Sequence, residues 1–358
     1  MEQTETINCP RCLFDSSFAT IGEKQCQYCD LHDTLEEMYN PKDFEPILEK
    51  IKSKKGKYNC LIGISGGLDS SVLLYAAVKY WNLKPLVIHF DNGWNAPEAE
   101  SNMKQLIATL NVDSITYTVN KLEYLKLNTA FLNFGLPDAD IPNDIAMTKL
   151  MYDTADKYGI KYILNGHDFR TEGSTPQGWT YMDAKYIQSV YSSFTGTELK
   201  NYPLFTFKDQ IIYGLKGIKQ VRPFYYINYR KNIEANMKHS ITWNEYGGKH
   251  CENIYTEFVG ADLLPNKFGI DKRIVYLSAL IRSGELTKLK AQALFEIKPT
   301  FDRNKLGEHK ALIEVYSSQE RGNRADFDHY DFKKYRIIIW MLMKLKIVPY
   351  TFYTKYAC

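Results

Sequence analysis

The sequence predicts an α/β fold in which a small metal-binding ribbon precedes a doubly wound parallel sheet and a helical domain follows it. Three observations predict this order. Two Cys-x-x-Cys pairs stand within the first thirty residues. Between residues 57 and 169, short apolar segments rich in β-branched residues alternate with segments of helical spacing. After about Tyr191, helical spacing dominates. We therefore expect a ribbon over residues 1–40, an α/β domain over 41–190 and a helical domain over 191–358.

Length and composition place the chain among globular proteins with more than one domain. The chain has 358 residues, of which 44% are hydrophobic and 24% are charged. Its net charge of +3 is small for a protein that binds nucleic acid, so we expect no nucleic-acid partner. The opening residues, "MEQTETINCP", lack the basic and apolar regions of a secretory signal, which favours a cytoplasmic location.

The most apolar stretch lies near the C-terminus and reads "YRIIIWMLMKLKIVPY", residues 335–350. A membrane-spanning helix needs about 20 predominantly apolar residues. This stretch is shorter, and Lys344 and Lys346 interrupt it. We expect no membrane insertion and interpret the stretch as a buried C-terminal helix.

The elements of the α/β domain follow from its alternating pattern. Strands are expected over the β-branched apolar segments, and helices over the segments whose apolar residues recur every three or four positions. The expected strands cover 57–65, 84–94, 113–119 and 160–169, and the expected helices between them cover 69–81, 97–110 and 143–159. Helical spacing continues over 207–217, 229–240, 251–264, 271–284, 286–296 and 331–347. Strand–helix alternation of this kind favours a parallel sheet with right-handed crossovers.

The two cysteine pairs predict a structural zinc site. "CPRC" and "CQYC" supply Cys9, Cys12, Cys26 and Cys29. Each Cys-x-x-Cys turn directs two thiolates toward one point, and two turns complete a tetrahedral site with no open position. His32 is an alternative ligand for one position. Paired redox dithiols are a second alternative, but neither pair opens a helix after a strand, as a thioredoxin-type site does.

The segment between the first expected strand and helix, "SGGLDSS", predicts a phosphate-binding loop. Adjacent glycines allow close approach of the backbone to a ligand, and the amides at the following helix N-terminus attract an anion. The loop lacks the Gly-Lys-Ser/Thr of a Walker A motif. A helix N-cap after a glycine turn is the alternative. The residues that we expect at the phosphates are Ser65, Gly66, Gly67, Asp69, Ser70 and Ser71.

Polar residues also follow two other expected strands. His89 and Asp91 end the second strand, and Gly166, His167 and Asp168 follow the fourth. Since a doubly wound sheet binds its ligand at the carboxyl ends of its strands, we expect both groups beside the phosphate loop. A simple turn at Asp91 and a buried core histidine at His167 are the alternatives.

Two basic clusters stand in the helical half. Lys249 and His250 follow a double glycine in "YGGKH", and Lys267, Lys272 and Arg273 lie in "LPNKFGIDKR". Paired cations near glycine turns suit a phosphate or diphosphate group. The alternative is a solvated charged helix start.

The loop resembles the "SGGxDS" loop of the PP-loop ATP pyrophosphatase superfamily, whose fold is a doubly wound parallel sheet. The resemblance implies that ATP is cleaved between its α and β phosphates, and that a substrate oxygen is adenylated before a nucleophile displaces AMP. Asp69 would then help to organise Mg²⁺ and the pyrophosphate. The resemblance, with the basic clusters, implies ATP contacts from Ser65, Gly66, Gly67, Asp69, Ser70, Ser71, His89, Asp91, Gly166, His167, Asp168 and Lys267.

"YGGKH", "FGIDKR" and "LSALIRSGELTK", with the ribbon and the loop, resemble the N-acetyl sugar amidotransferases over nearly the whole chain. The resemblance implies an ATP-dependent ligase of bacterial surface polysaccharide or nonulosonate biosynthesis. Such enzymes convert the acetamido group of a sugar, often nucleotide-linked, to an acetamidino group. A separate glutaminase with a cyclase-like channel subunit supplies the ammonia. Catalytic roles are expected for Asp69, Lys249, Lys272 and Arg273. Cys251 departs from the aromatic residue expected in relatives.

Two other functions fit parts of this outline. tRNA-thiolating enzymes also join zinc ribbons to PP-loops, but they need catalytic cysteines near the loop. Here Cys60 lies in the strand before the loop and Cys251 stands alone. A non-enzymatic scaffold that binds ATP without turnover is the other alternative, and release of AMP distinguishes it from the enzymes.

Overall fold

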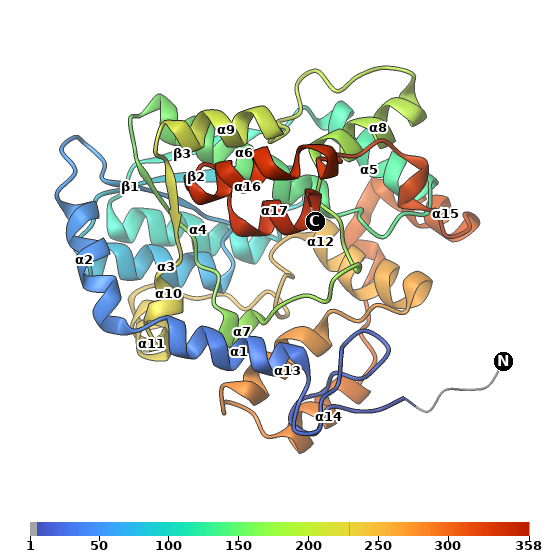
Figure 1. Ribbon diagram of the computed structural model, residues 1–358, viewed down its shortest axis with the longest axis horizontal. Helices are drawn as coiled ribbons and strands as arrows, with labels where there is room; N and C mark the ends of the chain where they lie inside the picture. The colour runs from blue at the N-terminus through green and yellow to red at the C-terminus, as the bar shows by residue number, and fades with distance from the viewer. Residues whose placement is uncertain (1–5, 229, 358) are drawn as a thin grey trace.

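The computed structural model describes residues 6–228 and 230–357 and contains one five-stranded parallel sheet (Figure 1). The strand order is β3-β2-β1-β4-β5, and neighbouring strands are parallel throughout. The strands are β1 (Cys60–Gly63), β2 (Pro85–Asp91), β3 (Ser114–Thr118), β4 (Tyr162–Leu164) and β5 (Lys219–Val221). The predicted doubly wound parallel sheet is confirmed. Its order changes direction between β1 and β4, where such a sheet places its ligand crevice.

Helices cover both faces of the sheet. The helices between strands are α3 (Leu68–Lys79), α4 (Pro97–Leu110), α5 (Lys121–Asn133), α6 (Ile141–Lys157), α7 (Phe169–Glu172), α8 (Ala184–Thr195) and α9 (Phe207–Leu215). Successive strand residues face opposite sides. On one side Ile62 and Val87 pack in a core with α3 and α4, whereas Leu61 and Ile88 face α5, α6 and α8 on the other.

The fifth strand comes from beyond residue 190, where helical spacing dominates the sequence. β5 pairs with β4 from Tyr162↔Lys219 to Leu164↔Val221. It has three residues, of which two are exposed, so it carries almost no apolar periodicity. The remaining short helices are α1 (Gln27–Met38), α2 (Pro41–Lys52), α10 (Pro223–Tyr226), α11 (Arg230–Ser240), α12 (Ile254–Phe258), α13 (Arg273–Arg282), α14 (Lys288–Glu296) and α15 (Ala311–Ser318). The described residues after β5 also include a π-helix, η1 (Val259–Phe268), and 3₁₀ turns at Arg303–His309, Arg324–Asp326 and Lys333–Tyr335.

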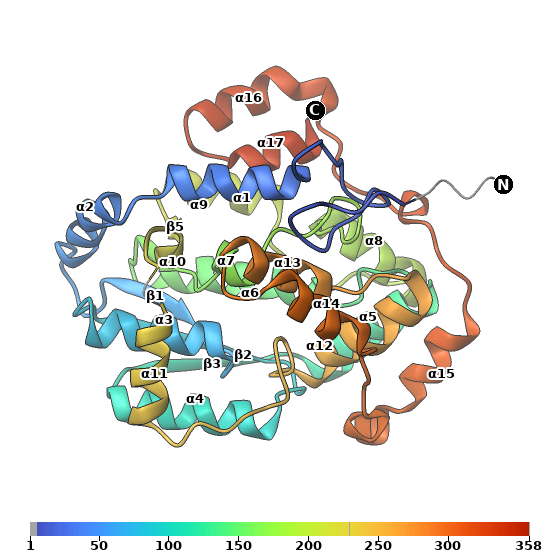
Figure 2. The same cartoon turned by 90° about the horizontal axis from the view of Figure 1, so that it is seen from below.

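The C-terminal helices α16 (Arg336–Lys344) and α17 (Tyr350–Tyr356) form a lobe at the outer edge of the molecule (Figure 2). The prediction of a buried C-terminal helix is wrong. Ile339 is buried, but Ile337 is 70% exposed and Met341 is 52% exposed. The lobe has a small core of its own around Ile339, Val348 and Ala357, and that core covers one side of α16.

Among the described residues, no helix is long and apolar enough to cross a membrane.

Candidate active site

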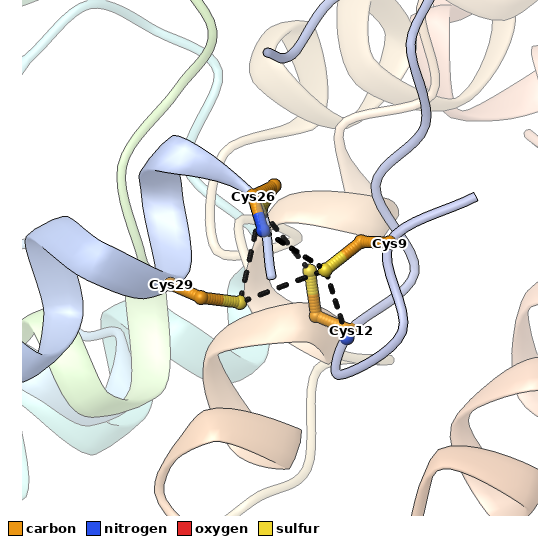
Figure 3. Close-up of side chains that lie close together, drawn as sticks. All are labelled: Cys9, Cys12, Cys26 and Cys29. Atoms are coloured by element: carbon orange, nitrogen blue, oxygen red, sulfur yellow. Dashed lines mark hydrogen bonds between the residues drawn. The ribbon is translucent and has the colours of Figure 1, made fainter. Parts of the chain in front are cut away.

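The four cysteines of the ribbon converge on one point (Figure 3). Their sulfur atoms all lie within 4.8 Å of one another. The Sγ–Sγ distances are 3.9 Å for Cys9–Cys29, 3.7 Å for Cys12–Cys26 and 3.7 Å for Cys26–Cys29. Four thiolates held about 2.3 Å from a tetrahedral zinc ion stand about 3.8 Å apart. The donor set therefore fits a single zinc ion, whereas a [4Fe–4S] cluster binds each thiolate to a different iron and spaces them more widely.

Hydrogen bonds and a buried cation complete the surroundings of the sulfurs. The amides of Cys12 and Cys26 donate to Cys9 Sγ at 3.5 and 3.3 Å. Arg282 from α13 donates to Cys29 Sγ at 3.4 Å and to Cys12 Sγ at 3.3 Å. A buried arginine beside several thiolates offsets their charge, so α13 is tied to the ribbon electrostatically. The ring of His32 packs edge-on against the ring of Phe169 instead, with 5.2 Å between the ring centres.

The ribbon braces the helices around the phosphate loop. Glu36 on α1 receives two hydrogen bonds from Arg170, at 2.6 and 2.5 Å. The Arg170 backbone oxygen in turn accepts a hydrogen bond of 2.8 Å from Ser283, which follows α13. Because Arg170 stands on α7, two positions after Asp168, the ribbon, α7 and α13 are linked at the edge of the site.

Tight backbone packing fixes the loop between β1 and α3. Gly66 has φ +78°, and a Cβ there would lie 2.0 Å from the Ala99 oxygen of α4. A Cβ on Gly166 would lie 2.8 Å from the backbone oxygen of Asp69. Only glycine allows these approaches. The loop is thus wedged between α4 and the end of β4, as its place at the switch point requires.

Several backbone N–H groups of the loop already donate hydrogen bonds to side-chain hydroxyl groups. Ser70 Oγ accepts a hydrogen bond from Ser65 N at 3.2 Å, and Ser65 Oγ accepts one from Gly67 N at 3.2 Å. The hydroxyl of Tyr246 accepts a 2.7 Å hydrogen bond from Leu68 N, in the first turn of α3. Amides in a first helical turn lack partners within the helix. Tyr246 therefore holds a donor that a phosphate would otherwise receive.

Asp69 lies in a compact cluster of opposite charges. Its carboxylate contacts the guanidinium of Arg230 from α11 and lies 3.4 Å from Lys249 Nζ. Burial alone would raise the pKa of Asp69, but Lys249 and Arg230 lower it well below the usual carboxyl range. Lys249 Nζ also lies 3.8 Å from Glu172. Two cations thus meet at the start of α3, beside the loop.

Asp168 caps the short helix α7 and is almost completely buried. Its side chain accepts a 3.0 Å hydrogen bond from Arg170 N, and Arg230 lies 3.8 Å away. Burial raises its pKa to about 6. The adjoining His167 hydrogen-bonds Glu172. The predicted Gly166–Asp168 turn therefore lies beside Asp69, as expected from the shared sheet edge.

Two adjoining cavities flank this cluster. One, of about 360 Å³, is lined by Asp69, Asp168, Arg230 and Lys249 among others. The second, of about 610 Å³, reaches from the loop and β2 into the helical half. The residues that line both are Gly248, Lys249, His250, Glu252 and Tyr276. The segment after the "YGG" turn is therefore the wall between the two cavities.

Glu252 in this wall faces the phosphate loop. A Cβ on Gly67 would lie 2.8 Å from its carboxylate. Desolvation, and then the nearby Asp69 and Glu172 carboxylates, raise its pKa to about 7. The backbone here is anchored to the segment after β2, since Ala96 N donates to Glu252 O at 2.9 Å and Ile254 N donates to Trp94 O at 2.7 Å. This pairing connects the helical half to the sheet at the site.

The structure separates the predicted site residues into four groups. Asp69, Asp168 and Lys249 line the smaller cavity, while Ser65, His89, His167, Lys249, Lys272 and Arg273 line the larger one. Gly66, Gly67, Gly166, Ser70 and Ser71 shape the loop without lining either cavity. Asp91 and Lys267 line neither cavity.

Asp91, Lys267 and Arg273 bind parts of the protein itself. Asp91 accepts a 3.0 Å hydrogen bond from Gly93 N, which is the simple turn that the sequence left as the alternative. Lys267 Nζ donates to the backbone oxygens of Tyr316 and Gln319, at 2.7 and 2.8 Å. Arg273, although it lines the larger cavity, pairs with Asp271 at 2.7 Å and donates to backbone oxygens at the end of α14.

His89 is buried and fully hydrogen-bonded. Its Nδ1 lies 2.9 Å from the backbone oxygen of Ile64, and its Nε2 lies 3.0 Å from Asn95 Nδ2. These two hydrogen bonds hold the start of the loop to β2.

The sequence analysis missed four residues that complete the cluster, namely Arg230, Glu172, Tyr246 and Glu252. Arg230 opens α11, far from any motif, and reaches Asp69 across 161 positions. Glu172 ends α7, and Tyr246 stands directly before the double glycine that we singled out. Only Tyr246, through its place in "YGGKH", carried a signal in the sequence.

Comparisons with known proteins find a family model that matches part of the helical half. Residues 252–346 match the family model "LPS biosynthesis protein WbpG-like, C-terminal domain". An uncharacterized protein of Methanocaldococcus jannaschii, MJ1599, is 23% identical over 256 residues, which cover 71% of this chain and 78% of that protein. The matched family segment begins at Glu252, in the wall between the cavities.

Solved structures resemble the chain only distantly. NMN synthetase from Francisella tularensis is 16% identical with a TM-score of 0.29, covering 56% of this chain and 96% of that one. The U34-tRNA thiolase NcsA from Methanococcus maripaludis, solved with its [4Fe-4S] cluster, is 13% identical with a TM-score of 0.32, covering 90% and 99%. NH₃-dependent NAD synthetase from Campylobacter jejuni is 12% identical with a TM-score of 0.28, covering 60% and 94%. The family model, in contrast, matches residues 252–346 of this chain directly, over part of the helical half.

Proposed function

We propose that the protein is an ATP-dependent amidotransferase that converts the acetamido group of a sugar to an acetamidino group, for a bacterial surface polysaccharide. One observation carries the proposal. Residues of the "SGGLDSS" loop and Glu252, where the match to the WbpG-like domain begins, line the same two adjoining cavities. The loop suits the phosphates of ATP, and the domain's family description names LPS biosynthesis. A site shared by both suits an enzyme that activates a sugar substituent with ATP.

In the first step, the acetamido oxygen attacks the α-phosphorus of ATP, and the bond to pyrophosphate breaks. The loop amides and hydroxyls hold the phosphates, provided that Tyr246 releases Leu68 N. Lys249 and Arg230, both held by Asp69, lie where they offset the charge of the departing pyrophosphate. Bound Mg²⁺ would supply further positive charge. Asp69 and Asp168 offer the carboxylate oxygens that this ion prefers.

In the second step, ammonia attacks the carbon of the O-adenylated amide, its C–N bond forms, and the C–O bond to AMP breaks. The nitrogen that has been added carries three protons and must lose one of them before AMP leaves and the acetamidino group forms. Glu252 is suited to receive that proton, because a group with a pKa of about 7 exchanges protons readily near neutral pH. We assign this role to Glu252 because its carboxylate lies between the loop and the larger cavity.

Ammonia is proposed to come from a separate glutaminase, delivered through a cyclase-like channel subunit. A glutaminase of the cysteine type needs a reactive thiolate. Burial raises the pKa of Cys60 far above its ordinary value, and burial raises the pKa of Cys251 to about 11. Both thiols stay protonated near neutral pH. The same argument disfavours tRNA thiolation, which needs reactive cysteines beside the loop.

A mass-spectrometric assay tests the proposal. Purified protein is mixed with Mg-ATP, excess ammonium at mildly alkaline pH, and diacetamido sugars, both free and nucleotide-linked. We expect AMP together with a sugar in which NH replaces the carbonyl oxygen. AMP without that sugar product would point to adenylation of another substrate, with tRNA tested next. The full absence of AMP, also with a glutaminase and channel subunit added, would favour an ATP-binding scaffold.

A further inference from the structure

The helix α16 exposes one apolar side to solvent. Ile337 is 70% exposed, Ile338 56%, Trp340 44%, Met341 52% and Leu345, directly after the helix, 69%. We call these five residues the α16 patch. Figure 2 shows the helix at the outer edge of the molecule, with α17 on its inner side. Apolar patches gathered in this way mark contact sites more often than singly scattered residues do.

The exposure arises from the composition of the helix. Its sequence, "RIIIWMLMK", is apolar all round, and such a helix is normally buried on every side. Ile339, Leu342 and Met343 face the lobe's small core. At 100° per residue, Ile337, Met341 and Leu345 lie on the opposite side. Folding therefore covers half of the helix and leaves the other half for a partner.

Cations surround the patch. Lys333, Lys334 and Arg336 precede or open α16, and Lys344 and Lys346 follow its exposed side. From Phe332 to the C-terminus the sequence has no Asp or Glu. Among the described residues, the four lysines form no ion pair, and Lys344 Nζ lies 5.5 Å from the centre of the Trp340 ring. The lobe thus carries a concentrated positive charge on a nearly neutral chain.

The charge selects among the partners that an apolar patch can have. If the partner were a second copy of this chain, the cations around its α16 patch would face those of the first copy. Like charges that face each other disfavour such a contact. An anionic bilayer surface instead offers phosphates to the lysines and hydrocarbon to the apolar side chains. Trp340 and Tyr335 are of the aromatic types enriched at membrane–water interfaces.

We propose that α16 docks the protein on the surface of an anionic lipid bilayer. The helix lies parallel to the bilayer, with the α16 patch among the upper acyl chains and the lysines at the headgroups. Nothing crosses the membrane, because α16 has 9 residues and a span needs about 20. The proposal is independent of the proposed reaction and concerns only where the protein stands when it works.

Vesicle flotation with the full-length, zinc-loaded protein tests this. One set of vesicles is phosphatidylcholine alone, and the other contains about 30% phosphatidylglycerol. We expect at least about tenfold stronger partition to the anionic vesicles, weakened when the Debye length is shortened from about 10 Å to about 3 Å by salt. The double variant Ile337→Ser/Met341→Ser should lose this partition. The matched control is Leu289→Ser, because Leu289 is 78% exposed on α14, away from the lobe.

Other outcomes overturn the proposal. Equal partition to both kinds of vesicle, or no partition, excludes an anionic lipid surface. Equal binding by the double variant and the Leu289→Ser control excludes α16 as the contact. If the double variant instead changes the oligomeric state in sedimentation, the occupant is a protein. Thermal melting of each variant ensures that lost binding is not lost folding, since exposed serines should leave the melting temperature unchanged.

Discussion

The ribbon and the phosphate loop each gather buried anions around an arginine from a distant helix, but only one of the two clusters is open. At the ribbon, Arg282 and backbone amides surround four thiolates whose spacing suits one zinc ion. At the loop, Arg230 and Lys249 neutralise Asp69 beside two cavities. Buried charges need counter-charges in both places. A closed cluster fixes structure, whereas an open cluster leaves cations that an incoming polyphosphate can share.

The largest expected effect comes from removing the carboxylate at the centre of the charge cluster beside the loop. Asp69→Ala removes the carboxylate that holds Arg230 and Lys249, and leaves two cations unpaired beside the loop. We expect AMP formation to fall by at least about 1000-fold, because positioned charges dominate phosphoryl transfer. The measurement is AMP release at saturating ATP and ammonium.

Glu49→Gln is the control for Asp69→Ala. Glu49 is an exposed carboxylate paired with Lys52 on α2, remote from both cavities, and its removal should leave the rate within about twofold. Near-normal AMP release by Asp69→Ala would exclude the proposed role of the loop.

Removing one thiolate from the ribbon cluster should lower the stability of the protein, and the lower stability should in turn reduce activity. Cys12→Ser leaves a tetrahedral site with three thiolates, and a four-cysteine zinc site supplies about 10–16 kcal/mol of folding free energy to an isolated motif. We expect a lower melting temperature, measured by calorimetry, and loss of bound zinc, measured by elemental analysis. Activity should fall because α7 and α13 lose their brace.

Cys251→Ser is the matched variant for the ribbon experiment. Cys251 lines the larger cavity and belongs to no metal cluster among the residues described. Zinc content and melting temperature should therefore stay unchanged. Equal zinc content in Cys12→Ser and Cys251→Ser would contradict the assignment of the four-cysteine site.

How much of these two clusters the sequence predicted depends on how local they are. The cysteine pairs and "SGGLDSS" are contiguous motifs, and each folds into the expected local geometry. Arg282, Arg230 and Glu252 complete the clusters from elements that follow much later, so their pairing depends on tertiary packing. The exposed side of α16 was mistaken for a core because composition alone does not show what covers a helix.

A smaller effect is expected at the wall between the cavities. Glu252→Gln keeps the shape but removes the proton acceptor, so we expect about a 100-fold loss in the ammonia-dependent step. At a fixed concentration of NH₃, the wild-type rate should rise with pH through about 7, and the variant should lack this limb. Exchange of labelled pyrophosphate into ATP, which reports the first step, should persist. Loss of that exchange would indicate a role in ATP binding instead.

The Glu252→Gln substitution should change stability and activity in opposite directions. Its pKa in the folded protein, about 7, lies above the value of about 4.5 for an ordinary glutamate. The protonated form is therefore favoured on folding, and stability declines as pH rises from about 4.5 to about 7. Glu252→Gln removes this decline, so the variant should gain stability relative to wild type at pH 8 while losing activity. Parallel urea titrations at pH 5 and pH 8 measure the difference.

The smallest expected effects separate two lysines that look alike in the sequence. Lys272 lines the larger cavity, and Lys272→Ala should raise the KM for a negatively charged sugar substrate by about tenfold, with little change in kcat. Lys267 instead donates to the backbone oxygens of Tyr316 and Gln319. Lys267→Ala should leave KM unchanged and cost about 1 kcal/mol of stability, the usual contribution of such hydrogen bonds. Steady-state kinetics with both variants decides the matter, because a KM effect at Lys267 would mean that the charge alone, and not its place in the fold, determines substrate binding.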